Sequence, residues 1–133
     1  MRIDDITIGH ALPTLPVPIT VSLVAGGAIA TRDYFPGHHD LEAARALGSP
    51  HIFMNILTTS GLVQRFVEQW AGPSCEFKSV KIKLGTPNYP GDIMTFSGEV
   101  SALDAATRTV ELTLKGVNGL GPHASGTVRL RLP

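Results

Sequence analysis

The C-terminal half of the chain alternates between apolar and polar residues, and this alternation predicts strands. Four segments share it: 79–84, 94–100, 109–115 and 127–132. In the first of them, Val80, Ile82 and Leu84 alternate with serine and lysine. A period of two residues gives a strand with one buried face and one face in water, which favours an antiparallel sheet. Three stretches rich in turn-forming residues separate the segments: 88–92, 104–107 and 118–122.

The middle of the chain predicts one amphipathic helix that runs from Asn55 to Trp70. Its apolar positions lie on one face at helical spacing: Ile56, Val63, Val67 and Trp70. Asn55 is a good N-cap residue, and the Gly72-Pro73 dipeptide ends the helix. Only Arg65 and Glu68 are charged, so we expect the helix to be largely buried.

An edge strand and two short helices are predicted before this helix. Leu15, Val17 and Ile19 alternate with Pro16 and Pro18, which restrict the strand to a sheet edge because proline has no N–H to donate. The two helical segments are 21–31, which contains Gly26-Gly27, and 40–47, which Asp40 caps and Gly48 ends.

The order of these elements predicts the fold class. One long helix followed by a run of antiparallel strands is typical of an α+β fold, in which the sheet wraps around the central helix and buries its apolar face. The chain has 133 residues, the length of a single domain, so we expect one domain over 1–133.

Composition excludes several classes of function. Acidic and basic residues number 11 each, which gives no sign of a nucleic-acid or membrane partner but leaves room for a local basic patch that binds a phosphorylated ligand. Cys75 is the only cysteine, so no intramolecular disulfide forms, and we expect a small buried residue in a cytoplasmic protein. Asp4 and Asp5 argue against a signal peptide, and no stretch approaches the roughly 20 apolar residues of a membrane span.

Candidate chemistry concentrates in residues 31–40. Asp33 and His38 flank the turn-forming Pro36-Gly37, and the two short helices on either side should fix this loop. A carboxylate and an imidazole on one short loop can face the same point, hold a water and move protons at neutral pH. The same two residues are also compatible with a capping aspartate and a surface histidine.

The other candidates for chemistry give weaker signals. Asp40 is better explained as an N-cap, and His39 should point away from His38, so we expect no metal site. Ser60 has no Gly-x-Ser-x-Gly context, which argues against a serine nucleophile. The remaining histidines are expected on the surface or in loops: His10, His51 and His123.

The segment from Asp33 to His38, Asp-Tyr-Phe-Pro-Gly-His, resembles the hydratase motif of the MaoC-like, R-specific enoyl-CoA hydratases. Several further landmarks follow in the order of that family: Asp40, Ala43 or Ala44, Gly48, Phe77, the Pro90-Gly91-Asp92 turn, Asn118, Gly121 and Gly126. The resemblance extends from about Leu15 to Pro133.

This resemblance implies a hotdog fold, association through the sheets and an acyl-CoA substrate without a further cofactor. It also implies reversible addition of water across a trans-2-enoyl thioester, with Asp33 and His38 holding the water and moving its protons. A backbone N–H near the start of the central helix would bind the thioester oxygen as negative charge develops on it.

One departure from the family narrows the assignment. Family members usually carry His-Gly at the head of the central helix, where this chain reads Met54-Asn55. With the segment from Thr59 through Gly61 to Arg65, this variant resembles the small catalytic subunit of heteromeric hydratases of steroid side-chain degradation. The resemblance implies Met54, Asn55 and Gly61 as substrate-binding residues, and a homodimer or a heteromer with a second MaoC-like subunit.

Two other functions compete with this one. A hotdog thioesterase usually places an acidic residue on the central helix to activate water, and here that helix offers only Glu68, near its far end. A non-catalytic partner that merely binds acyl chains or stabilises another subunit is the second alternative. The intact Asp33 and His38 argue against it, and the Met54-Asn55 variant argues slightly for it.

Overall fold

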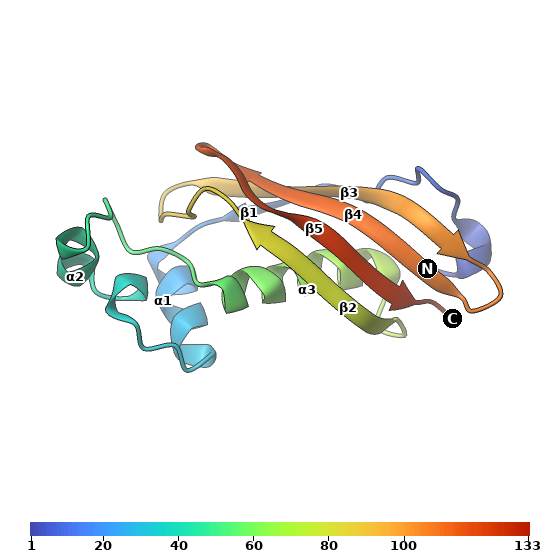
Figure 1. Ribbon diagram of the computed structural model, residues 1–133, viewed down its shortest axis with the longest axis horizontal. Coiled ribbons are helices and arrows are strands. Elements are labelled where there is room, and N and C mark those ends of the chain that lie inside the picture. The colour runs from blue at the N-terminus through green and yellow to red at the C-terminus, as the bar shows by residue number, and fades with distance from the viewer.

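The structure, a computed structural model, describes all residues 1–133 as a five-stranded antiparallel sheet with one long helix against it (Figure 1). The elements are η1 (Ile3–Asp5), β1 (Leu15–Pro18), α1 (Val21–Ala30), η2 (Pro36–His38), α2 (Leu41–Ala46), α3 (Ile56–Ala71), β2 (Glu76–Leu84), β3 (Ile93–Asp104), β4 (Thr109–Asn118) and β5 (Gly121–Arg131). The strand order is β1-β3-β4-β5-β2. The predicted α+β class, with the sheet curved around a central helix, is confirmed.

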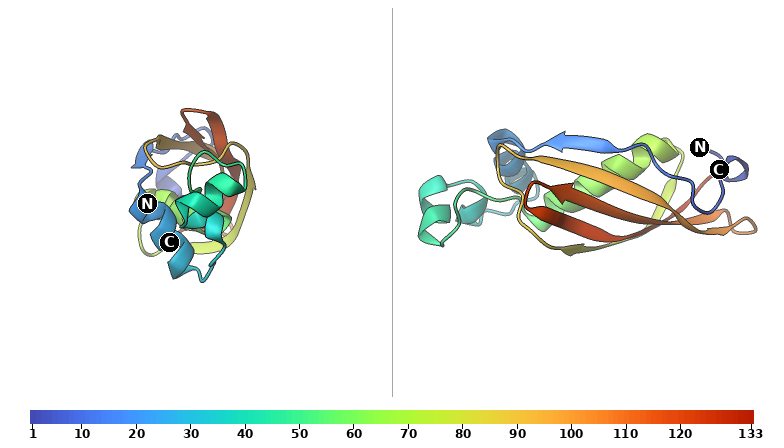
Figure 2. Two further views of the ribbon diagram at one scale, coloured as in Figure 1. Left: turned by 90° about the vertical axis from the view of Figure 1, so that its left-hand side faces the viewer. Right: turned by 90° about the horizontal axis from the view of Figure 1, so that it is seen from above.

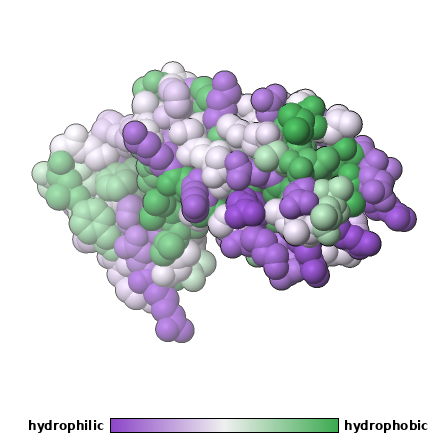
Figure 3. Space-filling model, turned by 45° about the vertical axis from the view of Figure 1, so that its right-hand side comes forward, coloured by the Kyte–Doolittle hydropathy of each residue, from purple (hydrophilic) through white to green (hydrophobic).

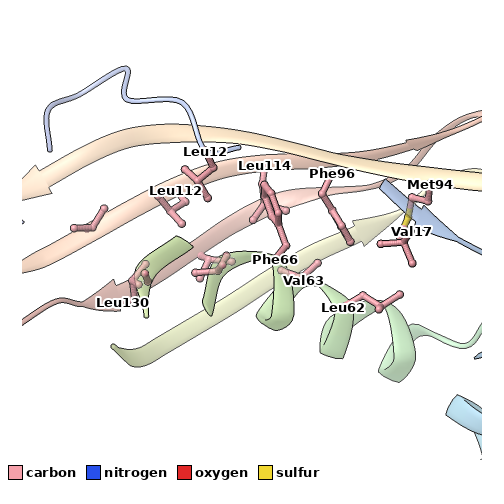
Figure 4. Packing of buried hydrophobic residues seen from close by; sticks show 14 of the residues in the cluster. Leu12, Val17, Leu62, Val63, Phe66, Met94, Phe96, Leu112, Leu114 and Leu130 are labelled. Atoms are coloured by element: carbon pink, nitrogen blue, oxygen red, sulfur yellow. The ribbon is translucent and has the colours of Figure 1, made fainter. Parts of the chain in front are cut away.

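Helix α3 joins the core through its apolar face. Val63 and Val67 are fully buried, and the ring of Phe66 stacks on Phe96 of β3 at a centroid distance of 5.3 Å (Figure 4). Truncating a buried phenylalanine to alanine typically costs about 3–5 kcal/mol, so this contact is a main support of the layer. The opposite face, with Arg65 and Glu68, is exposed. The expectation that this helix is largely buried is therefore correct only for the face that points toward the sheet.

The four C-terminal strands are longer than their alternating segments. β2 begins at Glu76 and includes Phe77, and β5 begins at Gly121, inside a stretch that was expected to separate strands. The register shifts at one point in each of the three long pairings, between residues 77 and 79, 100 and 102, and 116 and 117. A bulge adds a residue to one strand and breaks the alternation of faces, which explains why the pattern underestimates strand length.

The turn between β2 and β3 is tied to the β4–β5 hairpin. Gly91 has a φ of 97°, a backbone conformation that favours glycine, and places Asp92 at the start of β3. The Asp92 carboxylate accepts the Gly119 N–H at 3.0 Å, and the buried Asn118 donates to Asn88 Oδ1 at 2.9 Å. These contacts explain why the Pro-Gly-Asp turn and Asn118 occur together as landmarks of the sequence.

The sheet has two different edges. β1 pairs only with β3 and carries Pro16 and Pro18, which have no N–H to offer a further strand. β2 pairs only with β5, so its other side is unpaired over the nine residues Glu76–Leu84. The predicted edge strand is confirmed at β1, while β2 forms an open edge that can accept another strand.

Helices α1 and α2 extend beyond one end of the sheet, and the two chain termini lie at the opposite end (Figures 1 and 2). The segment between α1 and α3 contains Asp33 and His38, so the candidate chemistry lies at the end of the sheet where α3 begins. The short-helix predictions for 21–31 and 40–47 are confirmed, each to within one residue at either end.

The surface mixes charged and apolar side chains, and Figure 3 shows hydrophobic area at both ends of one face with hydrophilic area between them. Large apolar residues exposed near the start of α3 include Tyr34, Phe35, Ile56 and Leu57. None of the helices combines the length and the apolar character that crossing a membrane requires.

Candidate active site

The end of α1 fixes the backbone of Asp33. Arg32 adopts a left-handed conformation with a φ of 56°, its N–H donates to Ile29 O at 3.1 Å, and the Asp33 N–H donates to Ala28 O at 2.9 Å. This pair of bonds is the Schellman motif, in which a left-handed residue usually filled by glycine closes the last helical turn. Asp33 therefore leaves a helix end in one defined direction.

The position of His38 is fixed by a second segment of the chain, residues 52–54. The Phe53 N–H donates to Gly37 O at 3.0 Å, and His38 Nδ1 lies 2.6 Å from Phe53 O. The aromatic rings of Phe35 and Phe53 meet the His38 ring edge to face. A carbonyl oxygen only accepts hydrogen bonds, so Nδ1 carries a proton and Nε2 is left to react. A Cβ on Gly37 would come within 2.7 Å of the Phe53 ring, so glycine permits this approach.

Asp33 and His38 face each other, and the carboxylate is partly exposed to solvent. Asp33 Oδ2 lies 3.2 Å from His38 Nε2, with side chains that are 32% and 9% exposed. The Phe35 N–H donates to Asp33 Oδ1 at 3.2 Å. Hydrogen bonds from Asn55 and from the Phe35 N–H, with the nearby His38, hold the pKa of Asp33 below its ordinary value of 3.8. The carboxylate is therefore ionised at neutral pH, and its Oδ2 faces Nε2 of the imidazole.

Asn55 joins this pair to the central helix. Its Oδ1 accepts the Thr58 N–H at 2.9 Å, which confirms the predicted N-cap. Its Nδ2 donates to Asp33 Oδ2 at 3.1 Å and to Thr31 Oγ1 at 2.9 Å. The residue is 4% exposed.

The first turn of α3 presents free backbone donors beside the pair. The N–H groups of Asn55, Ile56 and Leu57 form no hydrogen bond in this structure, because the helix has no earlier carbonyl to accept them and the cap serves Thr58. The positive end of the helix dipole adds to their field. These groups fit an oxygen atom on which negative charge develops.

Two of the substrate-binding residues named from sequence, Met54 and Gly61, offer no free backbone donor beside the pair. Met54 is 4% exposed, and its N–H already donates to Asn88 O at 3.2 Å. Gly61 is exposed on α3, five residues after the helix begins, and a Cβ there would meet nothing within 4 Å. Helices α1 and α3 approach closely at Gly27, where a Cβ would clash with Thr58. The substrate-binding roles stay predictions, and the free donors lie at residues 55–57.

The expectation that His123 lies on the surface or in a loop is wrong. His123 is in β5 and 2% exposed, with Nε2 2.9 Å from Thr59 Oγ1 and Nδ1 2.6 Å from Thr86 O. Burial lowers the pKa of this imidazole. Thr59 Oγ1 also lies 3.4 Å from Asn55 O, so His123 contacts the first turn of α3 through the Thr59 hydroxyl. Alternation could not have revealed it, because His123 and the adjacent Ala124 are both buried where the register of the β4–β5 pairing shifts.

The other polar residues considered from sequence have partners of their own or lie in loops. Asp40 caps α2 by accepting the Ala43 N–H at 3.1 Å, and His39 points away from the pair, with Nε2 3.2 Å from Tyr34 O. His10 and His51 are half-buried in loops. No three His, Cys, Asp or Glu side chains lie close enough together to hold a metal ion.

The remaining candidates for other chemistries lie outside this site. Glu68 is 13 residues beyond Asn55 on α3, which at 1.5 Å per residue is roughly 20 Å away along the helix. Cys75 is half-buried against the core, and burial raises the pKa of its thiol, the opposite of what activates a nucleophile. Helix α3 itself therefore carries no acidic residue near its free N–H groups, which is where the thioesterase alternative would need one.

A sheet wrapped around one central helix, with an Asp–His pair beside the N-terminus of that helix, defines a hotdog-fold protein with an acid–base site. A family model described as "MaoC like domain" matches residues 5–118, so the chain belongs to the MaoC-like family.

Known proteins agree with this assignment. The chain is 46% identical over 125 residues to the 3-oxo-4,17-pregnadiene-20-carboxyl-CoA hydratase beta subunit of Mycobacterium tuberculosis, covering 94% of this chain and 95% of that protein. It superimposes on a chain of the ChsH1-ChsH2 complex from M. tuberculosis with a TM-score of 0.92 and 43% identity, covering 96% and 98% of the two chains. The (R)-hydratase from A. caviae involved in PHA biosynthesis has the same fold, with a TM-score of 0.88, 21% identity and coverage of 96% and 98%. These structures confirm the predicted hotdog fold.

Proposed function

We propose that this chain is the catalytic subunit of an enoyl-CoA hydratase that adds water across a trans-2-enoyl-CoA, in β-oxidation of a steroid side chain. One observation carries the proposal: the ionised Asp33 carboxylate lies 3.2 Å from His38 Nε2, beside three free backbone N–H groups at the start of α3. An acid–base pair and an oxyanion site are the two features that hydration of an enoyl thioester requires.

The pair supplies proton transfer in this mechanism. A water bound between Asp33 and His38 attacks C3 of the enoyl thioester, and one member of the pair accepts its proton. The pair then passes that same proton on to C2, so the product gains one hydroxyl and one hydrogen on the same face. The contact between Asp33 Oδ2 and His38 Nε2 lets the proton move between the two members, and its delivery to C2 restores the pair. No electrons leave the substrate, so the reaction needs no redox cofactor.

The start of α3 stabilises the intermediate. As water adds to C3, the thioester carbonyl becomes enolate-like and its oxygen gains negative charge. The N–H groups of Asn55, Ile56 and Leu57 point from the positive end of the helix and are unbonded, so they stabilise this charge without reorganising. Removing one such donor typically costs about 100- to 1,000-fold in rate.

The surroundings of the pair suit an acyl-CoA with a bulky apolar group. Tyr34 and Phe35 flank Asp33 and are 66% and 46% exposed, while Ile56 and Leu57 at the free N–H groups are 47% and 50% exposed. An open groove runs from the start of α3 along β2 and includes Ile56, Ser60, Lys81 and Lys83 in its lining. Apolar side chains suit the acyl group, and the two lysines suit the phosphates of coenzyme A. The pregnadiene named for the M. tuberculosis relative is such a bulky substrate.

We propose that the working enzyme is a heteromer with a second MaoC-like subunit. The Asp33 side chain is 32% exposed in this chain alone, and the β2 edge is unpaired over nine residues. The M. tuberculosis relative is named as a beta subunit, and its structural counterpart belongs to a complex of two named components. A partner sheet added along β2 would deepen the groove and enclose a large acyl group.

A cytoplasmic location fits this function. The single cysteine is a free thiol in a chain that forms no disulfide, which suits a reducing compartment. Fractionation of the source cells followed by immunodetection tests this location, and recovery of the chain from a secreted fraction would contradict it.

The test of function is a hydration assay. Two substrates are offered, a steroid enoyl-CoA and a short crotonyl-type CoA, to the purified chain alone and to the chain with a MaoC-like partner. Loss of the enoyl thioester absorbance reports turnover. We expect turnover of the steroid substrate to require the partner and the crotonyl-type substrate to react slowly.

Three results would decide against parts of this proposal. Turnover by the chain alone at the full rate of the complex would remove the need for a partner. Release of free coenzyme A from a saturated acyl-CoA would identify a thioesterase. Absence of hydration with every partner offered, from a chain that still binds acyl-CoA, would identify a non-catalytic subunit.

A further inference from the structure

We propose that Asn55 is a positioning residue, whose side-chain amide locks the Asp33 carboxylate onto the first turn of α3 so that the water site and the oxyanion site move as one unit. The inference deepens the proposed function and rests on it for its kinetic consequence. Its structural half, the coupling of Asn55 to Asp33, can be tested without any substrate.

The hydrogen bonds of Asn55 determine which way its amide points. Thr58 offers an N–H at 2.9 Å and a hydroxyl at 2.6 Å on one side, so the acceptor Oδ1 must lie there. The donor Nδ2 then faces Thr31 Oγ1 at 2.9 Å and Asp33 Oδ2 at 3.1 Å. The reversed amide would place its oxygen against a carboxylate and its N–H₂ against an N–H donor, so only one orientation is stable.

All the hydrogen-bonding capacity of this amide is used. Its oxygen accepts two bonds and its nitrogen donates two, within a residue that is only 4% exposed. The Thr31 hydroxyl donates onward to Gly27 O at 2.8 Å in the last turn of α1. The side chain therefore bridges the end of α1, which carries Asp33, and the start of α3, which carries the free N–H groups.

This bridging role explains why residue 55 is an asparagine. Ser, Thr, Asp and Asn all provide the acceptor that an N-cap needs, but only Asn among them also provides an N–H donor. Glycine at this position would leave the Asp33 carboxylate without this bond. The departure from the family's glycine thus adds a contact to Asp33, and the backbone N–H of residue 55 stays free.

The bond has an electrostatic effect that a cap alone would lack. The Asn55 amide is the largest influence that lowers the pKa of Asp33. Because the carboxylate accepts it through Oδ2, the oxygen that faces His38, the amide also sets the angle at which that oxygen meets the imidazole. Misplacing a reacting group by about 1 Å can cost roughly 100-fold in rate.

The experiment compares Asn55→Ser and Asn55→Asp with the wild type. Both variants keep an N-cap acceptor and lose the amide Nδ2 that reaches Asp33; the shorter serine carries a single hydroxyl, which the cap occupies. If Asn55 served only as a cap, neither variant should change the titration of Asp33 or kcat. The first readout is the titration of the Asp33 carboxyl in the full chain, followed by ¹³C NMR and assigned with Asp33→Asn. The second is kcat and KM for hydration in the assembled enzyme, with the melting temperature as a check on folding.

We expect the pKa of Asp33 to rise in Asn55→Ser and to rise further in Asn55→Asp, where a second carboxylate repels it. We expect kcat to fall by about 10- to 100-fold in both variants with KM changed less than about twofold. Asp40→Ser replaces the N-cap of α2 in the same way and serves as the matched control, with the Asp33 titration and kcat unchanged.

The outcomes separate this inference from the proposed function. An unchanged Asp33 titration in both folded variants would overturn the role of Asn55, whatever the activity. A shifted titration with unchanged kcat would overturn its kinetic half. A wild-type protein without hydratase activity would remove the proposed function, while the titration would still decide whether Asn55 holds Asp33.

Discussion

The chain contains two buried histidines that are held in the same way and serve different ends. In both, Nδ1 lies 2.6 Å from a backbone carbonyl oxygen, Phe53 O for His38 and Thr86 O for His123. The carbonyl makes Nδ1 the protonated nitrogen and leaves Nε2 to define the chemistry. His38 Nε2 faces the Asp33 carboxylate at the mouth of the site, and His123 Nε2 faces the Thr59 hydroxyl in the interior.

From this difference we infer that the partner of Nε2, rather than burial alone, decides which imidazole is placed for proton transfer. The carboxylate beside His38 is 32% exposed, so water can reach the pair and exchange protons with it. His123 is 2% exposed and its second nitrogen meets a neutral hydroxyl, so it has no water to activate. Mutations at His38 should lower activity, whereas mutations at His123 should lower the free energy of unfolding, so the comparison can be tested.

The largest expected effect comes from mutating Asp33 and His38. Asp33→Asn and His38→Ala should each lower kcat for hydration by about 100- to 10,000-fold, because each removes one of the groups that move protons. Steady-state kinetics on the assembled enzyme measure this loss, and circular dichroism checks that the fold persists. His39→Ala is the matched control, since that exposed neighbour contacts only Tyr34 O. Full activity in both site variants would break the comparison.

The next effect concerns the stability of the interior. His123→Ala should lower the free energy of unfolding by about 2–4 kcal/mol, because it opens a cavity and leaves Thr86 O and the Thr59 hydroxyl without their partner. Urea denaturation measures this change. The loss should exceed that of His51→Ala in a loop, and equal losses would mean that the interior contact contributes little.

A third effect sharpens the comparison through pH. Burial keeps the pKa of His123 in the folded chain below its ordinary value of 6.5. Above pH 6.5 the ring is neutral in both the folded and the unfolded chain, so its contribution to stability is complete. As the pH falls below 6.5, only the unfolded chain takes up the proton, and the free energy of unfolding must decrease.

Denaturation curves at pH 7.5 and at pH 5 measure this slope, and His123→Gln should make it shallower. The carboxyl groups with lowered pKa do not interfere, because Asp33 and Asp104 start from 3.8 and Glu76 from 4.5, all below this window. A variant whose slope equals that of the wild type would show that His123 is not kept neutral by the fold.

The smallest expected effect concerns the Thr59 hydroxyl, which faces His123 Nε2 as the Asp33 carboxylate faces His38 Nε2. Thr59→Val keeps the shape of the side chain and removes the contact with His123 Nε2. It should cost about 1–2 kcal/mol of stability, the typical range for a lost hydrogen bond in the interior, while kcat changes little. A large fall in kcat with unchanged stability would instead place Thr59 and His123 in the catalytic machinery.

The sequence predicts what depends on local periodicity and local motifs. The strands, the central helix and its Asn55 cap follow from spacing, and Asp33 and His38 stand out because they share one short loop. The Asp33 contact with His38 spans five residues and is within reach of such reasoning.

The sequence could not predict contacts between segments that are far apart along the chain. His123 meets Thr59 across 64 residues of sequence, and nothing near His123 indicates that a hydroxyl on α3 faces it. The Asn55 side chain meets Asp33 across 22 residues, so its cap was predictable and its second bond was not. The bond from the Met54 N–H to Asn88 O spans 34 residues and was likewise not predictable, while the substrate-binding role of Met54 stays a prediction.

If the proposed heteromer forms, the open edge of β2 links the abundance of this chain to that of its partner. An unpaired row of backbone donors and acceptors over nine residues can pair with a foreign strand as readily as with the intended one. Molecules made in excess of the partner would keep this edge uncovered and would enter non-native assemblies or be degraded. Balanced synthesis of the two subunits would then protect the protein pool as well as supply activity, and recombinant production of this chain should yield more native protein when the partner is made in the same cell.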